Sequence, residues 1–409
     1  MDTVLVVNAG SSSVKFQVFA IEREGPRRLI KGQVSGVGIR PRMRAEGANK
    51  EPLVDETYTP ERVNDVPAAL HTAGAWLRDK QHIEWVAVGH RVVHGGPQYD
   101  RPVLVDASVL ASLERYVSLA PLHQPNNLAP IRAIMSRSPQ LPQVACFDTA
   151  FHRNHDPLAD SYAIPWHLHA EGVRRYGFHG LSYEYIADLL PSLAPEIASG
   201  RVIVAHLGNG ASMCAISNGR SIETTMGFTA LDGLPMGTRP GQIDPGVVLY
   251  LVGEKKMSAA EVQSLLYHEC GLKGLSGISS DVRDLEKSSE PRARFALDYF
   301  TYRVGLYTGQ LAAALGGLDG FVFTAGIGEN SASVRSAIVK RLNWLGAEID
   351  DGANKAGKIP IAAPGSRIGL YVIPTDEELM IARHTLSLLA KRNAAAGIRK
   401  ARSAAHLSF

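Results

Sequence analysis

The sequence contains little cysteine, no long apolar run and almost no net charge. Its three cysteines, Cys146, Cys214 and Cys270, lie far apart along 409 residues, which argues against a disulfide framework and a CxxC zinc site. No stretch approaches the roughly 18 apolar residues that a membrane-spanning helix needs, and no charged leader precedes the first predicted strand. A formal charge of +3 is too weak to indicate nucleic-acid binding. We therefore expect a cytoplasmic protein without a membrane or nucleic-acid partner.

Two common phosphate-binding motifs are also missing. The sequence has no G-x-x-x-x-G-K-[ST] loop and no G-x-G-x-x-G in a Rossmann setting. What is present is an ordinary composition, with 45% hydrophobic and 20% charged residues, which does not indicate a disordered chain. A chain of 409 residues is long for one core and comfortable for two domains.

Residues 4–18, VLVVNAGSSSVKFQV, predict a β-hairpin whose turn can bind phosphate. VLVV has the β-branched character of a buried strand, and the residues after the turn alternate between apolar and polar. In the turn, Gly10, Ser11 and Ser13 supply an adaptable backbone, small hydroxyls and uncovered N–H groups. Such a concavity suits phosphate oxygens.

Two polar residues flank this turn. Lys15 can bring an ammonium toward the same anion, and Asn8 can reach a metal-bound water. A serine-rich hairpin turn with a solvated lysine is the alternative for this segment taken alone.

The same plan recurs 198 positions later in residues 202–216, VIVAHLGNGASMCAI. Here the turn consists of Gly208, Asn209 and Gly210, and the offset places Asn8 on His206. Two phosphate-type turns half a chain apart predict a duplicated α/β unit with a nucleotide held between the copies.

Several later segments carry charged residues at predicted strand ends. WVAVGHRVVHGG runs from a strand into a loop with Arg91, and VACFDTAFH delivers Asp148 at the end of another strand. Residues 151–176 are rich in histidine and aromatic residues without a period, and the pair Arg174-Arg175 precedes the turn YGFHG. Loops at strand ends are where α/β folds place their chemistry.

Three local features are predicted beyond this point. Ser182 is expected to cap a helix that runs through Leu190. Residues 325–330 are expected to form a glycine turn, and the closing helix is expected to span residues 377–391.

Seven motifs occur in an order and at spacings that match one known family: GHRVVHGG, FDTAFH, YGFHG, GTRPG, SSDVRDL, TAGIGENS and IPTDEEL. With the two hairpins they cover about residues 3–390, and over this length the sequence resembles the acetate kinase family. The resemblance implies an α/β fold of duplicated actin-like, ribonuclease H-like domains, with mixed sheets flanked by helices and the active site in the interdomain cleft. The expected domains are residues 1–148 with 378–391, and residues 149–377; the basic tail 392–409 is expected to be disordered.

The same resemblance implies a reversible, Mg²⁺-dependent transfer of the γ-phosphoryl group of ATP to acetate, giving acetyl phosphate and ADP by direct in-line transfer in a cytoplasmic homodimer. Acetate is already ionised at neutral pH, so no strong base is needed. The difficulty is repulsion between two anions, which calls for cations and hydrogen-bond donors. By resemblance, Arg91 holds the acetate carboxylate, His179 and Arg239 stabilise the transition state, and Asp148 is the catalytic aspartate.

Asn8 and Glu377 carry over as metal-binding positions for Mg²⁺, with Mn²⁺ as an alternative. Carboxylates with several waters are the usual magnesium ligands. Two residues depart from the family. Asp376 replaces a common asparagine and adds a charge near the metal, and Gln242 replaces a common aspartate and removes one.

The nucleotide-binding positions carry over from both hairpins and two later motifs. Glu329 and Asn330 also fit a plain helix N-terminus. The full set is Lys15, Ser11, Ser13, His206, Leu207, Gly208, Asn209, Gly210, Asp281, Val282, Arg283, Gly326, Ile327, Gly328, Glu329 and Asn330.

For the acyl pocket the resemblance gives Val93, Leu122, Phe178 and Ala230, the last at a position where several relatives have proline. A kinase for propionate or butyrate is the nearest alternative function. A non-kinase actin-like ATPase is a third, but it would not need GHRVVHGG, FDTAFH and YGFHG, which surround a small substrate with two arginines and a histidine.

Overall fold

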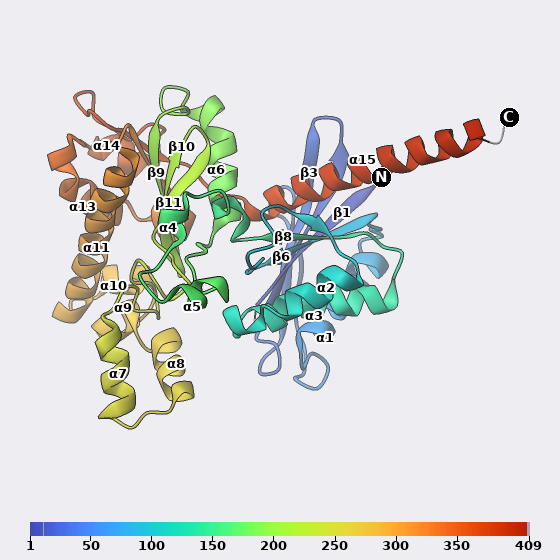
Figure 1. Ribbon diagram of the computed structural model, residues 1–409, viewed down its shortest axis with the longest axis horizontal. Helices are drawn as coiled ribbons and strands as arrows, with labels where there is room; N and C mark the ends of the chain where they lie inside the picture. Colours follow the sequence, from blue (N-terminus) through green and yellow to red (C-terminus); the bar gives the residue numbers. More distant parts are fainter. Residues whose placement is uncertain (11, 407–409) are drawn as a thin grey trace. The chain divides into compact units, whose positions relative to one another are not determined.

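The computed structural model describes residues 1–10 and 12–406, without the side chains of residues 395–406. The predicted phosphate residue Ser11 and residues 407–409 lie outside this part. The chain forms two compact units (Figure 1). Unit 1 contains Met1–Ala150 and the chain from Asp376 onward, and unit 2 is Phe151–Thr375. Within the described residues, every helix is too short or too polar to cross a membrane.

Unit 1 is built on an eight-stranded mixed sheet with the strand order β5-β4-β3-β2-β1-β6-β8-β7. β1 pairs in parallel with β6, and β6 with β8, whereas the other pairs are antiparallel. β1 is buried along almost its whole length, as expected for a central strand. The strands are β1 (Thr3–Ala9), β2 (Ser13–Glu22), β3 (Gly25–Ser35), β4 (Arg42–Gly47), β5 (Pro52–Thr57), β6 (Ala87–Val92), β7 (Val103–Leu104) and β8 (Gln143–Phe147).

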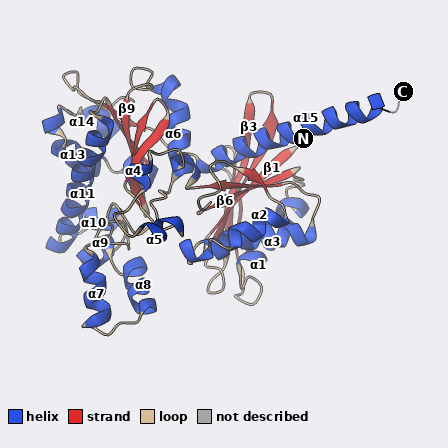
Figure 2. Cartoon of the chain, viewed as in Figure 1, coloured by secondary structure: helices blue, strands red, loops and turns tan. Residues whose placement is uncertain are grey.

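Helices flank this sheet (Figure 2). On one face, Trp76 and Leu77 of α1 join the core cluster that contains Val88 of β6. On the other face α15 lies so close to β6 that a Cβ on Gly89 would stand 2.5 Å from the hydroxyl of Thr385. Neighbouring residues of a strand face opposite sides, so α1 and α15 sandwich the sheet. The helices are α1 (Val66–Asp79), α2 (Ala107–Glu114), α3 (Gln124–Arg137) and α15 (Glu377–His406), with the 3₁₀ turn η1 (Val117–Leu119).

The closing helix is longer than predicted. It continues past Lys391 to His406 (Figure 1), so residues 392–406 are helical where disorder was expected. The segment is rich in alanine, the strongest helix former, and this propensity outweighs its charge.

Unit 2 contains a five-stranded sheet with the order β11-β10-β9-β12-β13. β9 pairs in parallel with β12, and β12 with β13; the remaining pairs are antiparallel. The strands are β9 (Arg201–Leu207), β10 (Ala211–Ser217), β11 (Arg220–Thr224), β12 (Gly320–Thr324) and β13 (Gly369–Val372).

The helices of unit 2 pack on this sheet and around the loops at its end. Ile186 and Leu190 of α6 join Val202 and Val204 of β9 in one core cluster, and α11 contacts β9, β10 and β11. The elements are α4 (Pro157–Asp160), α5 (Trp166–Ala170), α6 (Gly180–Leu193), α7 (Pro245–Gly253), α8 (Ala259–His268), α9 (Gly271–Ser276), α10 (Val282–Lys287), α11 (Pro291–Leu315), α12 (Ala325–Asn330), α13 (Ala332–Arg341) and α14 (Asp351–Ala356), with the 3₁₀ turns η2 (Ala150–His152) and η3 (Asn343–Leu345).

The two sheets repeat one topology, which confirms the predicted duplication. The order β3-β2-β1-β6-β8 of unit 1 matches β11-β10-β9-β12-β13 of unit 2, with the same parallel and antiparallel pairs. The turns of the two hairpins differ by one residue. Ala9 pairs with Val14 across residues 10–13, whereas Leu207 pairs with Ala211 across residues 208–210.

Candidate active site

An arginine–aspartate pair lies where the central strands of unit 1 end. Arg91 is on β6, and Asp148 directly follows β8. Arg91 Nε donates to Asp148 Oδ1 at 2.9 Å and Nη2 donates to Oδ2 at 2.6 Å. Asp148 is only 1% exposed, and a buried carboxylate is costly without such a partner. The parallel strands thus deliver both residues to the same edge of the sheet. Arg91 lies within β6 and not in the loop predicted for it, because the strand continues past Gly89 and pairs with β8 as far as Val92.

Two further predicted residues join this pair. Arg91 Nη1 donates to Asn8 Oδ1 at 3.5 Å, and Glu377, the first residue of α15, places Oε2 at 3.8 Å from Arg91 Nε. Burial raises the pKa of Glu377 to about 7, opposed by Arg91 and reinforced by the charges of Asp148 and Glu378. Burial alone would lower the pKa of Arg91, but the neighbouring carboxylates raise it above its ordinary value.

This donor set fits a hard cation. Asp148 and Glu377 offer carboxylate oxygens and Asn8 an amide oxygen, which are ligands that Mg²⁺ accepts. No group of three or more histidine, cysteine or acidic side chains within the described residues could hold a metal. The set therefore suits a cation that keeps much of its water and binds few protein oxygens.

Asp376 and Gln242, the two residues expected to depart from the family, have partners of their own. Asp376 Oδ2 accepts from Arg28 Nη1 at 3.1 Å, and its Oδ1 accepts from the backbone N–H of Leu379 at 2.9 Å. In unit 2, Gln242 Oε1 accepts from Arg303 Nη2 at 2.7 Å and from the hydroxyl of Tyr307 at 3.1 Å. Each departure is thus compensated locally by hydrogen bonds.

In unit 2, His179 and His206 stack with ring centroids 4.2 Å apart. His179 precedes α6 in the left-handed conformation with φ 57°, and its Nδ1 lies 2.8 Å from Ser212 Oγ. His206 Nδ1 lies 2.8 Å from Ser182 Oγ. The prediction that Ser182 caps the helix is wrong, because α6 begins at Gly180 and the hydroxyl contacts His206 instead.

The second predicted arginine lies beside the same turn. A Cβ on Gly210 would stand 2.9 Å from Arg239 Nη2 and 3.2 Å from His179 Nε2, so both side chains converge on this glycine. Arg239 Nη1 donates to the carbonyl oxygen of Ala230 at 2.7 Å. Two nitrogen-bearing side chains around an open backbone turn make a site for anionic oxygens.

A cavity of about 700 Å³ in unit 2 brings three predicted segments together. Ser280, Glu286 and Ser331 also line it, and reasoning from the sequence missed them although Ser280 and Ser331 lie within recognised motifs and Glu286 directly follows one. Hydrogen bonds from Arg283 lower the pKa of Asp281 to about 2. The predicted residues in the lining are Gly208, Asn209, Asp281, Val282, Arg283, Gly326, Ile327 and Asn330.

The glycine turn at residues 325–330 is instead the short helix α12, entered through Ala325 at φ 63°. A Cβ on Gly326 would meet open space, whereas one on Gly328 would stand 3.4 Å from the backbone of Phe323. Glu329 Oε1 accepts from the backbone N–H of Thr375. Gly326 thus borders the cavity, and Gly328 and Glu329 hold the helix in place.

The first hairpin turn is less enclosed. The backbone N–H of Gly10 donates to the carbonyl of Ser13 at 2.8 Å, and Lys15 is exposed beside a cavity of about 490 Å³. Phosphate binding by Ser13 and Lys15 stays a prediction.

The four predicted acyl-pocket residues are divided between the units. Val93 is buried and Leu122 is half-buried in unit 1. In unit 2, Phe178 is buried next to His179, and the carbonyl of Ala230 accepts from Arg239. A common pocket for these residues also stays a prediction.

Comparisons with known proteins identify the family of the chain. The acetokinase family model matches residues 3–383. Acetate kinase from Nitrobacter hamburgensis is 68% identical over 394 residues, covering 96% of this chain and 98% of that protein. Acetate kinase from Rhizobium meliloti is 58% identical, covering 96% of this chain and all (100%) of that protein.

Solved structures give the same result. Acetate kinase from Porphyromonas gingivalis matches with a TM-score of 0.85 and 37% identity, covering 95% of this chain and 100% of its own. A propionate kinase from Francisella tularensis matches with a TM-score of 0.87 and 35% identity, covering 94% and 99%. With a family match over nearly its whole length and relatives at this identity, the chain belongs to the acetokinase family.

Proposed function

We propose that the protein is an acetate kinase that transfers the γ-phosphoryl group of ATP reversibly to acetate, giving acetyl phosphate and ADP. The observation that carries this proposal is 68% identity to an acetate kinase over 96% of the chain. The geometry is consistent with it, since the sites gather arginine and histidine side chains where two anions must approach one another.

In unit 1, Arg91 is the residue that would bind the carboxylate of the acid. Its Nε and Nη2 are held by Asp148, which fixes the plane of the guanidinium, while its Nη1 makes only a 3.5 Å contact with Asn8. A planar guanidinium matches a carboxylate in shape and charge. Fixing it before the acid binds reduces the entropy lost on binding.

Mg²⁺ would be held by Asp148, Glu377 and Asn8, with Mn²⁺ as an alternative. The bound cation would neutralise charge on the phosphate oxygens. The nearby Arg91 keeps this carboxylate pair from being an uncompensated negative charge when no cation is bound.

In unit 2, the 700 Å³ cavity would take the nucleotide, between the hairpin turn at Gly208 and the helices α10 and α12. His179 and Arg239 converge on Gly210 and would donate to the γ-phosphoryl oxygens. Donors placed around a phosphoryl group stabilise its charge in the transition state. The residues proposed for the acid and for the nucleotide thus lie in different units, which we infer to be the two domains of the protein.

Propionate kinase activity is the second candidate, supported by the solved propionate kinase of similar fold and by the small side chain of Ala230. The relatives from Nitrobacter hamburgensis and Rhizobium meliloti, at 68% and 58% identity, are both acetate kinases. We therefore place acetate first and expect propionate to be a slower substrate.

A second copy of the chain is the partner that we propose. Helix α7 has no buried residue, and Val247, Leu249, Tyr250 and Val252 on it are between 45% and 73% exposed. Such a patch marks an interface, and closed pairs are the commonest assemblies. Leu249→Glu should halve the molar mass measured by light scattering; an unchanged mass would exclude this face as the dimer interface.

A cytoplasmic location of the protein fits the use of ATP.

The test of the function is acetate-dependent formation of ADP, measured against the rate of ATP hydrolysis without acetate. Acetate should raise the rate strongly and should yield acetyl phosphate, which hydroxylamine traps. A rate that is independent of acetate, propionate and butyrate would instead support an actin-like ATPase.

A further inference from the structure

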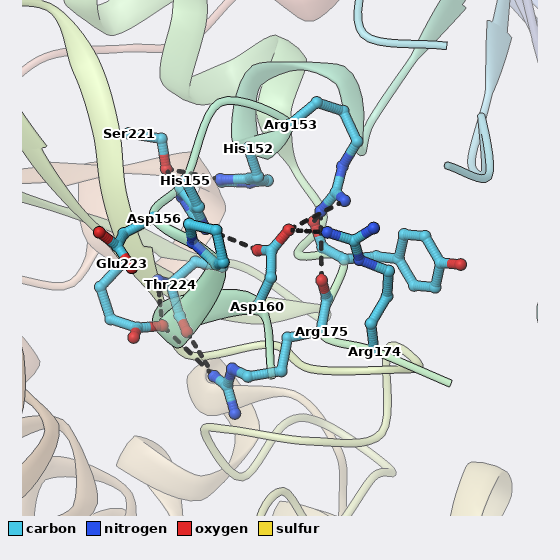
Figure 3. Close-up of polar contacts among 12 residues, drawn as sticks. His152, Arg153, His155, Asp156, Asp160, Arg174, Arg175, Ser221, Glu223 and Thr224 are labelled. Carbon is cyan, nitrogen blue, oxygen red and sulfur yellow. Dashed lines mark hydrogen bonds and ion pairs between the residues drawn. The ribbon is translucent and has the colours of Figure 1, made fainter. Parts of the chain in front are cut away.

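A buried cluster of charged side chains lies in unit 2 around Asp160 (Figure 3). At its centre, Asp160 accepts from Arg153 Nη1 at 3.3 Å, Arg174 Nη2 at 2.9 Å and His155 Nδ1 at 3.2 Å. Its burial favours a higher pKa, but the hydrogen bond from His155 and the two arginine charges lower the pKa of Asp160 overall. Asp160 is therefore an ionised carboxylate.

One set of contacts runs from Asp160 through Arg153. While Arg153 Nη1 faces Asp160, Nη2 donates to the carbonyl oxygens of Arg175 at 3.2 Å and Tyr176 at 2.7 Å. The guanidinium side chain is 4% exposed. It therefore ties the carboxylate to two successive peptides of the turn.

A second set runs through two histidines and a serine. His155 Nε2 lies 2.6 Å from Ser221 Oγ, which lies 2.7 Å from His152 Nδ1 (Figure 3). His152 Nε2 lies 3.0 Å from the carbonyl oxygen of Phe178. Phe178 directly precedes His179, so this chain of hydrogen bonds ends on the peptide that carries the left-handed His179.

The His152 ring also packs on the turn itself. A Cβ on Gly177, which has φ 72°, would stand 2.6 Å from His152 Cδ2. The ring thus occupies the space that a side chain at position 177 would fill, and it holds the turn by packing as well as by its hydrogen bond.

The protons in this chain can be counted. The Phe178 carbonyl only accepts, so His152 Nε2 must carry a proton; if the ring is neutral, its Nδ1 accepts the single proton of Ser221. The Asp160 carboxylate also only accepts, so His155 Nδ1 must carry a proton. His155 Nε2 then faces a serine oxygen whose proton is already committed, and its 2.6 Å contact is attractive only if Nε2 is protonated too.

The chain therefore holds one proton more than two neutral imidazoles. Burial and the neighbouring His155 hold the pKa of His152 well below its ordinary value, whereas His155 faces the Asp160 carboxylate. The extra proton accordingly lies on His155. Cys214 Sγ lies 3.1 Å from Ser221 Oγ and 3.6 Å from the carbonyl oxygen of Ala215, and burial raises the pKa of its thiol.

We propose that this network positions His179 for phosphoryl transfer, with Asp160 and Ser221 as positioning residues and His155 as a doubly protonated link between them. The inference rests on the proposed function for the role of His179, but the charge of His155 can be measured independently of it. The network adds no group to the substrates. It fixes the backbone from which the His179 ring extends.

The first experiment needs no variant. Neutron diffraction from crystals of the deuterated protein at neutral pH should show deuterium on both ring nitrogens of His155 and only on Nε2 of His152. Deuterium on a single nitrogen of His155 would overturn the proposal.

The second experiment measures catalysis. Ser221→Ala removes the link between the two rings and should lower kcat by roughly 10-fold to 100-fold, since a displacement of about 1 Å at a reacting group costs that much. KM for ATP and acetate should change little, because Ser221 lies outside the residues proposed to bind them. The matched control is Ser366→Ala, whose hydroxyl donates to Ile368 O at 2.7 Å and accepts from the Glu348 N–H. This control should keep wild-type kcat.

The outcomes separate the two proposals. A wild-type protein without acyl-dependent turnover contradicts the proposed function and leaves the neutron result to decide the charge of His155. An active wild type with unchanged kcat in folded Ser221→Ala contradicts the positioning role, as does an equal loss in Ser366→Ala.

Discussion

The ends of β1, β6 and β8 in unit 1 and of β9, β12 and β13 in unit 2 occupy the same places in a repeated sheet, but their side chains differ in charge. Val7 pairs with His90 in unit 1, and Ala205 pairs with Phe323 in unit 2. The next residue is Arg91 on β6 and Thr324 on β12, which are equivalent strands of the two sheets. An ion pair in one copy is thus represented by a neutral hydroxyl in the other.

The equivalent strands β8 and β13 show the same difference in charge at their ends. Ala145 pairs with His90, and Val372 pairs with Phe323, so Asp148 and Thr375 both lie three residues beyond equivalent positions. The hydroxyls of Thr324 and Thr375 have no hydrogen-bond partner in the described part of the chain.

The difference teaches how one fold supports two tasks. Under the proposed function, the charged pair at the strand ends of unit 1 would bind a small anionic acid, whereas hydroxyls, glycines and backbone N–H groups in unit 2 would leave room for a nucleotide. The fold provides the strand ends, and the residues placed there determine the chemistry.

Removing the charge from unit 1 should have the largest effect. Arg91→Ala should lower kcat/KM for acetate by roughly 100-fold to 1000-fold, the cost of losing a charged donor to a reacting group. It should also destabilise the unit, because Asp148 would remain buried without its partner.

A matched control is Arg201→Ala in unit 2. Arg201 makes the same two-bond contact with Asp319, at 2.9 and 2.6 Å, but both side chains are more than one-third exposed. Its kcat/KM should stay within about twofold of wild type. Equal losses in the two variants would show that the ion pair of unit 1 has no special role.

Acid should destabilise the protein through its buried histidines. His90 in unit 1 is 1% exposed, with Nε2 at 2.8 Å from Gln143 Oε1, and burial lowers its pKa to about 4. Between pH 6.5 and 4 the unfolded chain binds a proton there and the folded chain does not. The free energy of unfolding should therefore fall by about 3 kcal/mol as the pH drops through this window.

Urea unfolding at several pH values measures this slope, and His90→Gln should reduce it. His152 should add a slope of the same sign in unit 2, since burial also lowers its pKa. A pH dependence that is the same in wild type and His90→Gln would contradict the assignment for unit 1.

These contrasts also mark what the sequence could predict. Runs of β-branched residues before a glycine revealed both hairpins, and motif residues that are distant in sequence lie close together in each unit. The cluster around Asp160 was not predicted, because Ser221 approaches it from a strand more than 60 residues away. Residues 151–176 showed only an aperiodic excess of histidine and aromatic residues, which carries no signal of such pairing.

The predictions for residues 325–330 and for the start of α6 were wrong because of the local backbone conformation. The glycine turn at residues 325–330 is a helix because Ala325 adopts φ 63° and redirects the chain into α12. Ser182 resembles an N-cap in sequence, but the left-handed His179 already begins the helix one turn earlier. Both cases depend on a backbone conformation that residue type alone does not specify.

Adding a side chain inside the cavity of unit 2 should weaken the binding of ATP and leave the binding of acetate unchanged. Gly326→Ala adds a methyl group where nothing lies within 4 Å and where φ is not positive, so the fold should be retained. Because Gly326 lines the 700 Å³ cavity, we expect KM for ATP to rise about 10-fold, comparable to an ill-fitting methylene.

The control is Gly309→Ala on α11, where the new Cβ would stand 3.7 Å from Trp344 in ordinary contact. KM for ATP and acetate should both be unchanged there. A Gly326→Ala enzyme that also has a raised KM for acetate would contradict the division of tasks between the units.

The smallest effect is expected from acyl selectivity, at the residue that contacts Arg239. Ala230 is smaller than the proline that the resemblance implies for this position, and its carbonyl accepts from Arg239 Nη1 at 2.7 Å. Its N–H donates none of the loop hydrogen bonds in the described part of the chain, so Ala230→Pro keeps the contact with Arg239.

A hydrophobic pocket discriminates by about 1 to 3 kcal/mol per methylene, which predicts a wild-type preference for acetate over propionate on the order of 10-fold to 100-fold. Filling one wall with proline should raise this preference by about another 3-fold to 10-fold. Measuring kcat/KM for both acids on both proteins tests the assignment: an unchanged ratio removes residue 230 from the pocket, and a wild type that prefers propionate makes the second candidate function the correct one.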